Sequence, residues 1–304
     1  MTLVFLTPTS QLRLAAMFYR LALFTHMYRK QERLLPIAFG ITVHKGARLL
    51  GRLLQAIYMP NNVYCIHIDK TSSKLFHRAV EAIIRCLPNV FIARTSSDVV
   101  WGHFSLVQAQ INCMKELLES WIPWKYYISL VGQDFPLYDN KQIVIALQRL
   151  NNLNSIKSYP MLKLNECLQL SEVFKLRGNA IYNSSIPKSP PPHRIALYKV
   201  STHIVVIREF VEFVIHSKIG KDFTEYLKDT YIPDETLYAS LQQHPLARVV
   251  SMVTTNLDTT CFAMGSRGVP RGLGKASLLD FYRRFAMGTG TRNERETVCP
   301  QDSV

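Results

Sequence analysis

The stretch from residue 36 to residue 70 restricts the possible folds more than any other part of the chain. Residues 37–43 form a short apolar run rich in β-branched side chains, and a second apolar run covers residues 63–68. Between them, residues 49–57 repeat apolar side chains on one face of a helix. Two strands joined by one amphipathic helix predict a βαβ unit with parallel strands and a right-handed crossover.

This unit also predicts where a ligand would bind. In parallel sheets, ligands lie beyond the carboxyl ends of the strands. His44 and Lys45 follow the first strand and Asp69 follows the second, so we expect the three side chains at one rim of the sheet. A cap on the next turn is the alternative role for Asp69, and the spacing favours neither role over the other.

The chain continues with further candidate strands and helices, which predicts an α/β fold. The predicted helices cover residues 73–87, 105–120, 140–150, 208–217 and a stretch from about 236, and the predicted strands cover residues 89–93, 126–131 and 197–207. Residues 151–192 have mixed composition and end in three consecutive prolines, so we expect a long, partly irregular connection there.

Composition narrows the choice of partners. The net charge of +14 favours anionic ligands such as nucleic acid, a membrane surface or a phosphorylated small molecule. The basic residues are scattered and never form a run of five, so a solvated basic surface is the simpler interpretation and no nucleic-acid partner is expected. The cysteines form no Cys-x-x-Cys pair and no paired Cys/His spacing, which gives no indication of a zinc site.

Two features bear on the cellular compartment. Residues 12–28 are largely apolar but are interrupted by Arg13, Arg20 and His26, whereas a spanning helix needs about 20 apolar residues with few charges. Residues 1–35 are therefore expected to form an amphipathic leader, with a weak membrane anchor as the alternative. The sequence Asn183-Ser184-Ser185 is an N-glycosylation sequon, which is modified only if the chain enters the secretory route.

A series of stretches resembles the core-2/I-branching β-1,6-N-acetylglucosaminyltransferase family. They include I-T-V-H-K at 41–45, the long match at 52–70, C-L-P-N-V-F-I-A at 86–93, Q-I-N-C-M-K-E-L-L at 110–118, W-K-Y-Y-I-S-L-V-G-Q-D-F-P at 124–136, R-E-F-V-E-F-V at 208–214 and D-T-Y-I-P-D-E-T-L-Y-A-S-L-Q at 229–242. Their number and their order make a chance similarity very improbable. They place a glycosyltransferase domain at residues 36–248.

The resemblance implies a GT-A-like α/β fold, with a Rossmann-like βαβ sheet flanked by helices. It also implies inverting transfer of N-acetylglucosamine from UDP-GlcNAc to the 6-hydroxyl of galactose or N-acetylgalactosamine in O-glycans on a glycoprotein or glycolipid. Members of the family are single-pass type II Golgi membrane proteins with a lumenal catalytic domain. They work without a divalent metal or another cofactor, and the D-x-D metal motif is absent from this sequence.

The same resemblance assigns the site residues. Glu235 matches the catalytic base, which must lie within hydrogen-bond reach of the attacking hydroxyl. The alternative for Asp234 and Glu235 is capping of the helix that follows Pro233, the default interpretation of an isolated P-D-E. Asp234 is expected to support this loop or cap the helix.

Further assignments follow by matching position. The expected donor contacts are Val43, His44, Asp69 and Trp101. Asp134, directly after the predicted strand 126–131, is expected to organise its own loop rather than to touch the donor. His103 stands where the family carries a small polar residue, so we interpret it as a substituted loop residue.

The sequence also departs from the family pattern. A family cysteine that forms a disulfide is replaced by Val131, so its partner, represented by Cys65 or Cys113, is expected to be unpaired. Val200 stands where the family has a glycine, and a larger residue could crowd backbone that must approach closely. The resemblance ends after Arg248, before the family's basic segment that grips the diphosphate.

The tail at residues 249–304 is therefore expected to be basic and disordered. Arg267, Arg271 and Lys275 could neutralise phosphate charge, but nothing aligns them with the family's residues. Two alternatives to an active β-1,6-N-acetylglucosaminyltransferase remain open. One is a weak or inactive relative that at most binds a nucleotide sugar or a glycan, and the other is a xylosyltransferase-like enzyme, which shares the Trp101-Gly102 pair.

Overall fold

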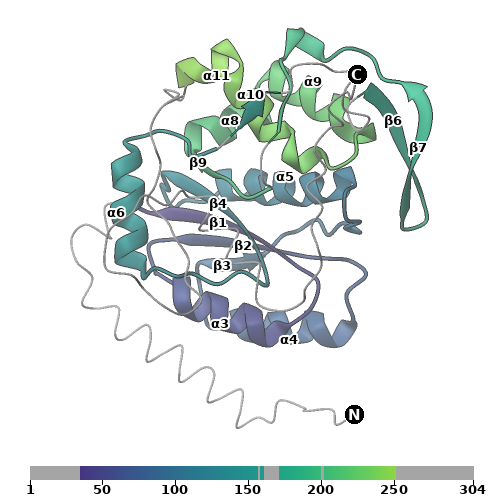
Figure 1. The fold of residues 1–304 in the computed structure, drawn as a ribbon. Helices are drawn as coiled ribbons and strands as arrows, with labels where there is room; N and C mark the ends of the chain where they lie inside the picture. The colour runs from purple at the N-terminus through teal and green to yellow at the C-terminus, as the bar shows by residue number, and fades with distance from the viewer. Residues whose placement is uncertain (1–34, 157, 161–170, 200–201, 251–304) are drawn as a thin grey trace, which may run out of the picture.

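The computed structural model describes residues 35–156, 158–160, 171–199 and 202–250. Its centre is a five-stranded sheet in the order β3-β2-β1-β4-β9 (Figure 1). Four strands run parallel, namely β1 (Ile37–Val43), β2 (Val63–Ile68), β3 (Val90–Ile92) and β4 (Tyr126–Val131), and β9 (Val205–Ile207) is antiparallel to β4. The α/β fold predicted from the sequence is confirmed.

The βαβ unit at the start of the domain is also confirmed. Strands β1 and β2 pair in parallel, with Ala38 opposite Val63, and α3 (Ala47–Ile57) connects them. Every residue of β2 is buried, as expected of a central parallel strand that helices cover on both faces. Leu50, Leu53, Leu54 and Ile57 form the buried face of α3.

Helices form layers on both faces of the sheet (Figure 1). On one face lie α3 and α4 (Lys74–Ile84), and on the other lies α5 (Phe104–Leu118). An outer group beyond α5 contains α8 (Arg208–His216), α9 (Lys218–Tyr226), α10 (Leu237–Gln243) and α11 (Pro245–Val250). Helix α6 (Asn140–Leu150), which begins with a capping box between Asp139 and Gln142, stands at the left end of the sheet in Figure 1.

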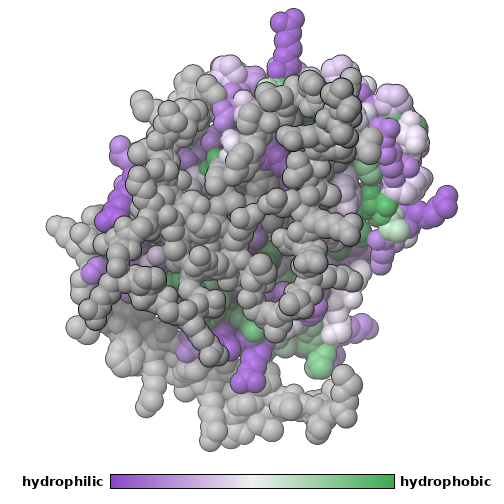
Figure 2. All heavy atoms as spheres, viewed as in Figure 1, coloured by the Kyte–Doolittle hydropathy of each residue, from purple (hydrophilic) through white to green (hydrophobic). Residues whose placement is uncertain are grey.

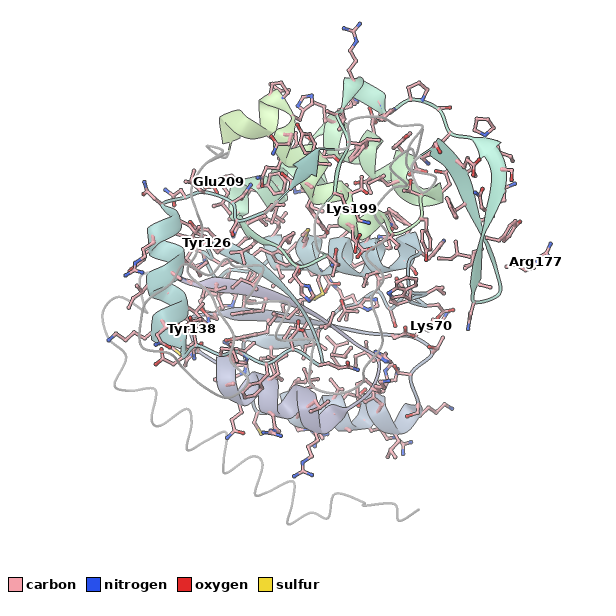
Figure 3. The ribbon with its side chains drawn as sticks, viewed as in Figure 1. Lys70, Tyr126, Tyr138, Arg177, Lys199 and Glu209 are labelled. Atoms are coloured by element: carbon pink, nitrogen blue, oxygen red, sulfur yellow. A yellow bond between two sulfur atoms is a disulfide. The ribbon has the colours of Figure 1, made fainter. Side chains whose placement is uncertain are left out.

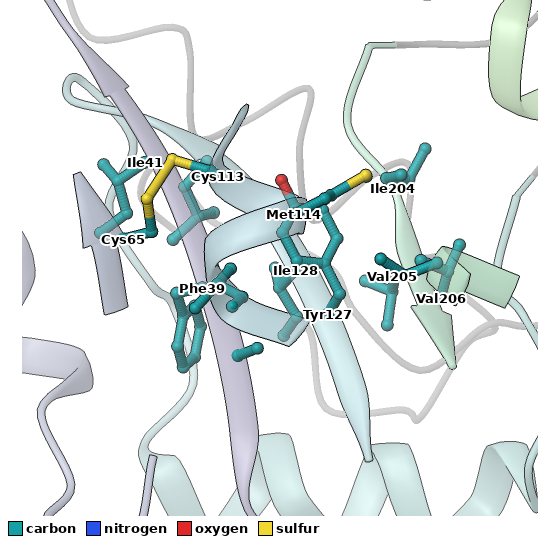
Figure 4. Packing of buried hydrophobic residues seen from close by; sticks show 14 of the residues in the cluster. Phe39, Ile41, Cys65, Cys113, Met114, Tyr127, Ile128, Ile204, Val205 and Val206 are labelled. Atoms are coloured by element: carbon teal, nitrogen blue, oxygen red, sulfur yellow. A yellow bond between two sulfur atoms is a disulfide. The ribbon is translucent and has the colours of Figure 1, made fainter. Parts of the chain in front are cut away.

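A disulfide between Cys65 and Cys113 joins β2 to α5 across the core (Figure 4). The two Cα atoms are 5.5 Å apart, and both residues are buried. The expectation that one of them is left unpaired was wrong, because β2 and α5 pack directly on each other and bring the two side chains together. Among the described residues, the free cysteine is Cys86, which is exposed.

Residues 151–192 contain more regular structure than predicted. Strands β6 (Glu172–Arg177) and β7 (Ala180–Pro187) form an antiparallel hairpin in a sheet of their own. Most of the residues in the hairpin are exposed, so its strands lack the alternating apolar pattern by which a strand is recognised in a sequence. Gly178 lies in its turn with a φ of 58°, in the left-handed region that glycine tolerates.

The predicted strand 197–207 is divided into two. Its first part is β8 (Tyr198–Lys199), which pairs with β5 (Tyr159–Pro160), and its last part is β9. Three short 3₁₀ helices complete the described elements: η3 (Pro192–Arg194), η4 (Leu227–Asp229) and η5 (Pro233–Glu235). The helix predicted from about residue 236 is α10, while α9 was not predicted.

Several expectations concern residues outside the described part of the chain. These are the leader, apart from its last residue, and the tail from residue 251 with Arg267, Arg271 and Lys275. Val200 also lies outside it. Among the described residues, every helix is too short or too polar to cross a membrane.

Candidate active site

Asp69 holds two loops together at the carboxyl end of β2. It is only 4% exposed. Its Oδ1 accepts hydrogen bonds from the backbone N–H of Thr71 at 2.8 Å and from the Thr71 hydroxyl at 2.6 Å, as a turn cap does. Its Oδ2 accepts a third bond from the backbone N–H of Val99 at 3.1 Å. Asp69 therefore caps its own turn and also anchors the loop that leads to Trp101.

The end of β1 lies beside Asp69. The backbone N–H of Asp69 donates to the carbonyl of Val43 at 2.9 Å, and Val43 itself is buried. His44 is exposed, and its carbonyl accepts a hydrogen bond from the Ser72 hydroxyl. Gly132 follows β4 on the other side, where a Cβ atom would lie 2.6 Å from Cγ1 of Val43. Only a glycine permits this approach of the two strand ends.

The turn at Trp101 makes direct contact with the loop that carries Glu235. The Trp101 side chain is 73% exposed, and its ring stands edge-on to Tyr231 with centroids 6.0 Å apart. Gly102 has a φ of 76°, and its carbonyl accepts a hydrogen bond from the backbone N–H of Ile232 at 2.8 Å. His103 caps α5, because its Nδ1 accepts from the Ser105 N–H. The turn expected to contact the donor and the loop of the expected base are thus adjacent.

Glu235 lies at the end of η5 with its side chain 31% exposed. Its Oε2 is 3.2 Å from Nζ of Lys199, whose side chain is 26% exposed. Figure 3 shows Lys199 on the side of the sheet that α5 covers. Sequence reasoning missed Lys199, and the only signal near it was the departure from the family pattern that begins at Val200. Burial, and next the charge of Glu235, raise the pKa of Tyr231.

Asp234 points away from solvent, unlike its neighbour Glu235. It is 5% exposed, and burial raises its pKa to about 6 although a hydrogen bond from the Thr202 side chain opposes that shift. The Thr202 hydroxyl also accepts from Nε2 of Gln110, whose Oε1 accepts from the Tyr238 hydroxyl at 2.9 Å. This buried polar network connects the base loop to α5 and α10.

Asp134 lies in the turn that follows β4. It is 2% exposed, and its Oδ2 accepts a hydrogen bond from the backbone N–H of Val131 at 2.7 Å. Nε2 of His203 is 3.4 Å from the same oxygen. These contacts close the turn after β4. Asp134 thus belongs to a buried pair, while Asp69, Trp101 and Glu235 are connected through the 99–102 loop.

The hairpin of β6 and β7 stands next to this loop. Phe174 of β6 stacks on Tyr231 with centroids 5.2 Å apart. Ile181 of β7 lies 3.5 Å from the point where a Cβ atom on Gly102 would be. Green hydrophobic residues are visible among purple ones at the right of Figure 2, where the hairpin stands, and the exposed apolar side chains of the hairpin are Leu176, Tyr182 and Ile186.

Asn183, the residue of the sequon, is exposed on β7. Its Oδ1 accepts a hydrogen bond from the backbone N–H of Ser185 at 2.8 Å, and its side-chain amide donates to the Glu172 carboxylate. The first contact is an Asx turn within the sequon.

The arrangement as a whole offers a partly exposed carboxylate on a loop that contacts the turn of an exposed aromatic ring, near the carboxyl ends of parallel strands. In Figure 3, Lys70 marks that end of β2, on the same side of the molecule as the hairpin in Figure 1. Such a carboxylate can take a proton from a hydroxyl. Within the described residues, no three or more His, Cys, Asp or Glu side chains cluster as metal ligands would.

An α/β sheet with these groups at its carboxyl edge has the architecture of a glycosyltransferase of the nucleotide-sugar class. More particularly, the chain belongs to the core-2/I-branching enzyme family, whose model matches residues 37–263. The matched region extends beyond Arg248, where the stretches recognised in the sequence end.

Relatives from different sources support this membership. The chain is 40% identical over 216 residues to the rat beta-1,3-galactosyl-O-glycosyl-glycoprotein beta-1,6-N-acetylglucosaminyltransferase 3, covering 70% of this chain and 48% of that protein. It is 39% identical to transferase 4 of the same name from Danio rerio, covering 69% and 50% of the two chains. A transferase from bovine herpesvirus 4 is 40% identical, covering 71% and 49%.

The chain therefore spans about half the length of the curated relatives it matches. Among solved structures, a 4-diphosphocytidyl-2C-methyl-D-erythritol synthase from Anaerococcus prevotii aligns over 64% of this chain and 86% of its own. Its TM-score is 0.31 at 12% identity, which is too distant to bear on function.

Proposed function

We propose that this chain transfers N-acetylglucosamine from UDP-GlcNAc to the 6-hydroxyl of galactose or N-acetylgalactosamine in O-glycans, with Glu235 as the base. One observation carries this proposal: the Glu235 carboxylate is 31% exposed on a loop that is hydrogen-bonded to the Trp101-Gly102 turn. Family membership supports it, and so do the relatives, which are named as β-1,6-N-acetylglucosaminyltransferases.

The proposed reaction is a single displacement with inversion. The acceptor 6-hydroxyl oxygen forms a bond to the anomeric carbon while its proton passes to the Glu235 carboxylate. The bond between the anomeric carbon and the diphosphate oxygen breaks, and its electron pair leaves with UDP. The base must therefore lie on the acceptor side of the sugar, opposite the diphosphate.

We assign the donor to the edge formed by Val43, His44, Asp69 and Trp101. The exposed Trp101 ring provides an apolar surface for a base or a sugar, and the ends of β1 and β2 provide backbone groups. Asp69 also contributes indirectly, because its bond to Val99 holds the loop that leads to Trp101. Since the sequence has no D-x-D motif, we propose that basic side chains rather than a divalent metal neutralise the diphosphate.

The proposed location is the Golgi membrane, with the catalytic domain in the lumen and a glycoprotein or glycolipid as acceptor. The disulfide between Cys65 and Cys113 supports an oxidising compartment, since such bonds are rare in the cytosol. The exposed sequon at Asn183 supports the same route.

The test is transfer of labelled N-acetylglucosamine from UDP-GlcNAc to a mucin-core disaccharide in the presence of EDTA. Removal of a general base costs about 10²–10⁴-fold in rate, so Glu235→Gln should lose at least about 100-fold in kcat. The matched control is Glu225→Gln, which removes an exposed carboxylate on α9 and should leave kcat unchanged.

Equal turnover by Glu235→Gln and the wild-type chain would contradict the assignment of the base. Transfer from UDP-xylose instead of UDP-GlcNAc would favour the xylosyltransferase-like alternative. No turnover with either donor, from a chain that unfolds cooperatively on heating, would indicate an inactive relative that at most binds a nucleotide sugar or a glycan.

A further inference from the structure

We infer that Lys199 is a positioning residue for the base: its ammonium holds one oxygen of the Glu235 carboxylate and directs the other to the acceptor hydroxyl. This inference rests on the proposed function. Its starting point is the distance of 3.2 Å between Nζ of Lys199 and Oε2 of Glu235. Among the described residues, Lys199 is the only cationic side chain recorded within ion-pair distance of Glu235.

The backbone of Lys199 is fixed independently of that ion pair. Lys199 pairs with Tyr159 in the short β5–β8 sheet. The preceding residue, Tyr198, donates its backbone N–H to Oγ of Ser240 at 2.9 Å. Ser240 belongs to α10, which begins directly after η5 with Glu235. The cation and the carboxylate are therefore attached to neighbouring parts of one rigid element.

The ion pair of Lys199 and Glu235 is partly buried. The two side chains are 26% and 31% exposed, so neither extends freely into solvent. By contrast, the ion pair of Lys218 and Asp222 has a lysine that is 80% exposed. Exposed ion pairs contribute little because two long side chains must be ordered, and partial burial reduces that loss.

The two carboxylate oxygens of Glu235 have different surroundings. Oε2 is taken by the ammonium, and no partner is recorded for Oε1 among the described residues. An ion pair at Oε2 restricts the rotation of the carboxylate, so Oε1 is the oxygen left to accept the proton of an incoming hydroxyl. Lys199 touches neither the donor nor the reacting hydroxyl in this arrangement.

The experiment compares Lys199→Met and Lys199→Arg with the wild-type full chain in the transfer assay. Lys199→Met keeps most of the side-chain volume but removes the charge, and it should lower kcat about 10-fold or more while KM for UDP-GlcNAc changes less than about twofold. Lys199→Arg keeps the charge and should recover most of kcat. Lys218→Met, which breaks an exposed ion pair within α9, should behave as wild type.

Three results would overturn the inference. The first is unchanged kcat in Lys199→Met, and the second is a loss of kcat that Lys199→Arg does not relieve. The third is an effect confined to KM for UDP-GlcNAc, which would make Lys199 a donor contact. If Lys199 contributed only to stability, Lys199→Met would lower the midpoint of thermal unfolding without a loss of kcat at nearly constant KM, and this result would also contradict the inference.

A second measurement keeps the inference testable if the wild-type chain shows no turnover and the proposed function itself fails. The midpoints of thermal unfolding of Lys199→Met, Glu235→Gln and the double variant form a double-mutant cycle. Coupled residues should give a double variant that loses less than the two single losses added together. Strictly additive losses would show that the ion pair does not form, and the inference would be wrong.

Discussion

Asp234 and Glu235 are neighbours in the sequence, but their environments are opposite. The Glu235 side chain is 31% exposed and paired with Lys199, whereas Asp234 is buried beside Thr202 and the polar network behind it. The family resemblance predicts Glu235 as the base and Asp234 as a support for the loop, while the P-D-E motif by itself indicates helix capping for both. The structure separates a carboxylate that can meet a hydroxyl from one that stabilises the loop behind it.

The raised pKa of Asp234 gives a pH dependence with a definite sign. Since burial raises its pKa from 3.8 to about 6, the folded state binds more protons than the unfolded chain between about pH 4 and 6. Stability from this residue is fully present below pH 4 and is lost as the pH rises through 6. The loss amounts to about 3 kcal/mol, since one pKa unit corresponds to about 1.4 kcal/mol.

Asp234→Asn should therefore remove this part of the pH dependence, so that its free energy of unfolding falls less than that of the wild type between pH 4 and 7. Denaturant unfolding at several pH values measures the difference. Glu81→Gln, which changes an exposed carboxylate on α4, should keep the wild-type dependence. If the free energy of unfolding depends on pH in the same way for Asp234→Asn and the wild type, ionisation of Asp234 does not destabilise the fold and the prediction is wrong.

Among the site residues, the sequence predicted those that belong to local patterns. Asp69 and Glu235 follow a strand and a Pro-Asp pair, and both positions can be recognised without a structure. Lys199 could not be found in this way. Its contact with Glu235 depends on the β5–β8 pair, whose strands are far apart in the sequence and only two residues long. Such a short pair leaves no apolar periodicity.

Among the elements, the strands of the large sheet and most of the helices around it were predicted. The strands β1, β2 and β4 are continuous apolar runs because helices cover both of their faces. The hairpin of β6 and β7 pairs only with itself and is mostly exposed, so its sequence carries little apolar signal. Helix position and strand position were thus predictable where burial on the sheet imposes a pattern.

Two glycines in neighbouring elements provide a matched test of close packing. Gly132→Ala would place a Cβ atom 2.6 Å from Cγ1 of Val43, so the ends of β1 and β4 must separate. We expect a loss of about 1–3 kcal/mol in the free energy of unfolding. Gly51→Ala in α3 would place its Cβ atom 3.7 Å from Ile83, an ordinary contact, and should gain about 0.5–1 kcal/mol.

Denaturant unfolding of both variants measures these opposite effects. A Gly132→Ala chain as stable as the wild type would mean that the strand ends at the donor edge move apart without cost. In that case the edge that holds Val43 would be less rigid than its packing indicates.

At the scale of the whole molecule, the disulfide and the sequon both bear on the cellular compartment in which the chain folds. The Cys65–Cys113 bond crosses from the sheet to α5, and Asn183 lies on the outer hairpin. The disulfide holds two layers of the core together, and the sequon asparagine is exposed in the folded chain. Disulfides are typical of oxidising compartments, and a sequon is modified only on the secretory route, so both features support the proposed Golgi location.

Expression through the secretory route should therefore attach an N-glycan to Asn183. An exposed asparagine whose sequon forms an Asx turn is accessible for modification. The expected result is a gel band that becomes smaller after endoglycosidase treatment and is already small in Asn183→Gln. Asn179→Gln, in the turn of the same hairpin but outside any sequon, should keep the larger band.

A wild-type chain that is secreted but shows no change after endoglycosidase treatment would contradict this prediction. The measurement is independent of transferase activity. It therefore also reports the route of the chain if the enzymatic proposal fails.

The hairpin described above has its own two-stranded sheet, and its Phe174 and Ile181 contact Tyr231 and the turn at Gly102. Because β6 and β7 pair only with each other, we expect substitutions at their exposed positions to leave the register of the large sheet unchanged. Under the proposed function, the hairpin is therefore an arm at which acceptor preference can change while the sheet that carries the donor edge stays the same.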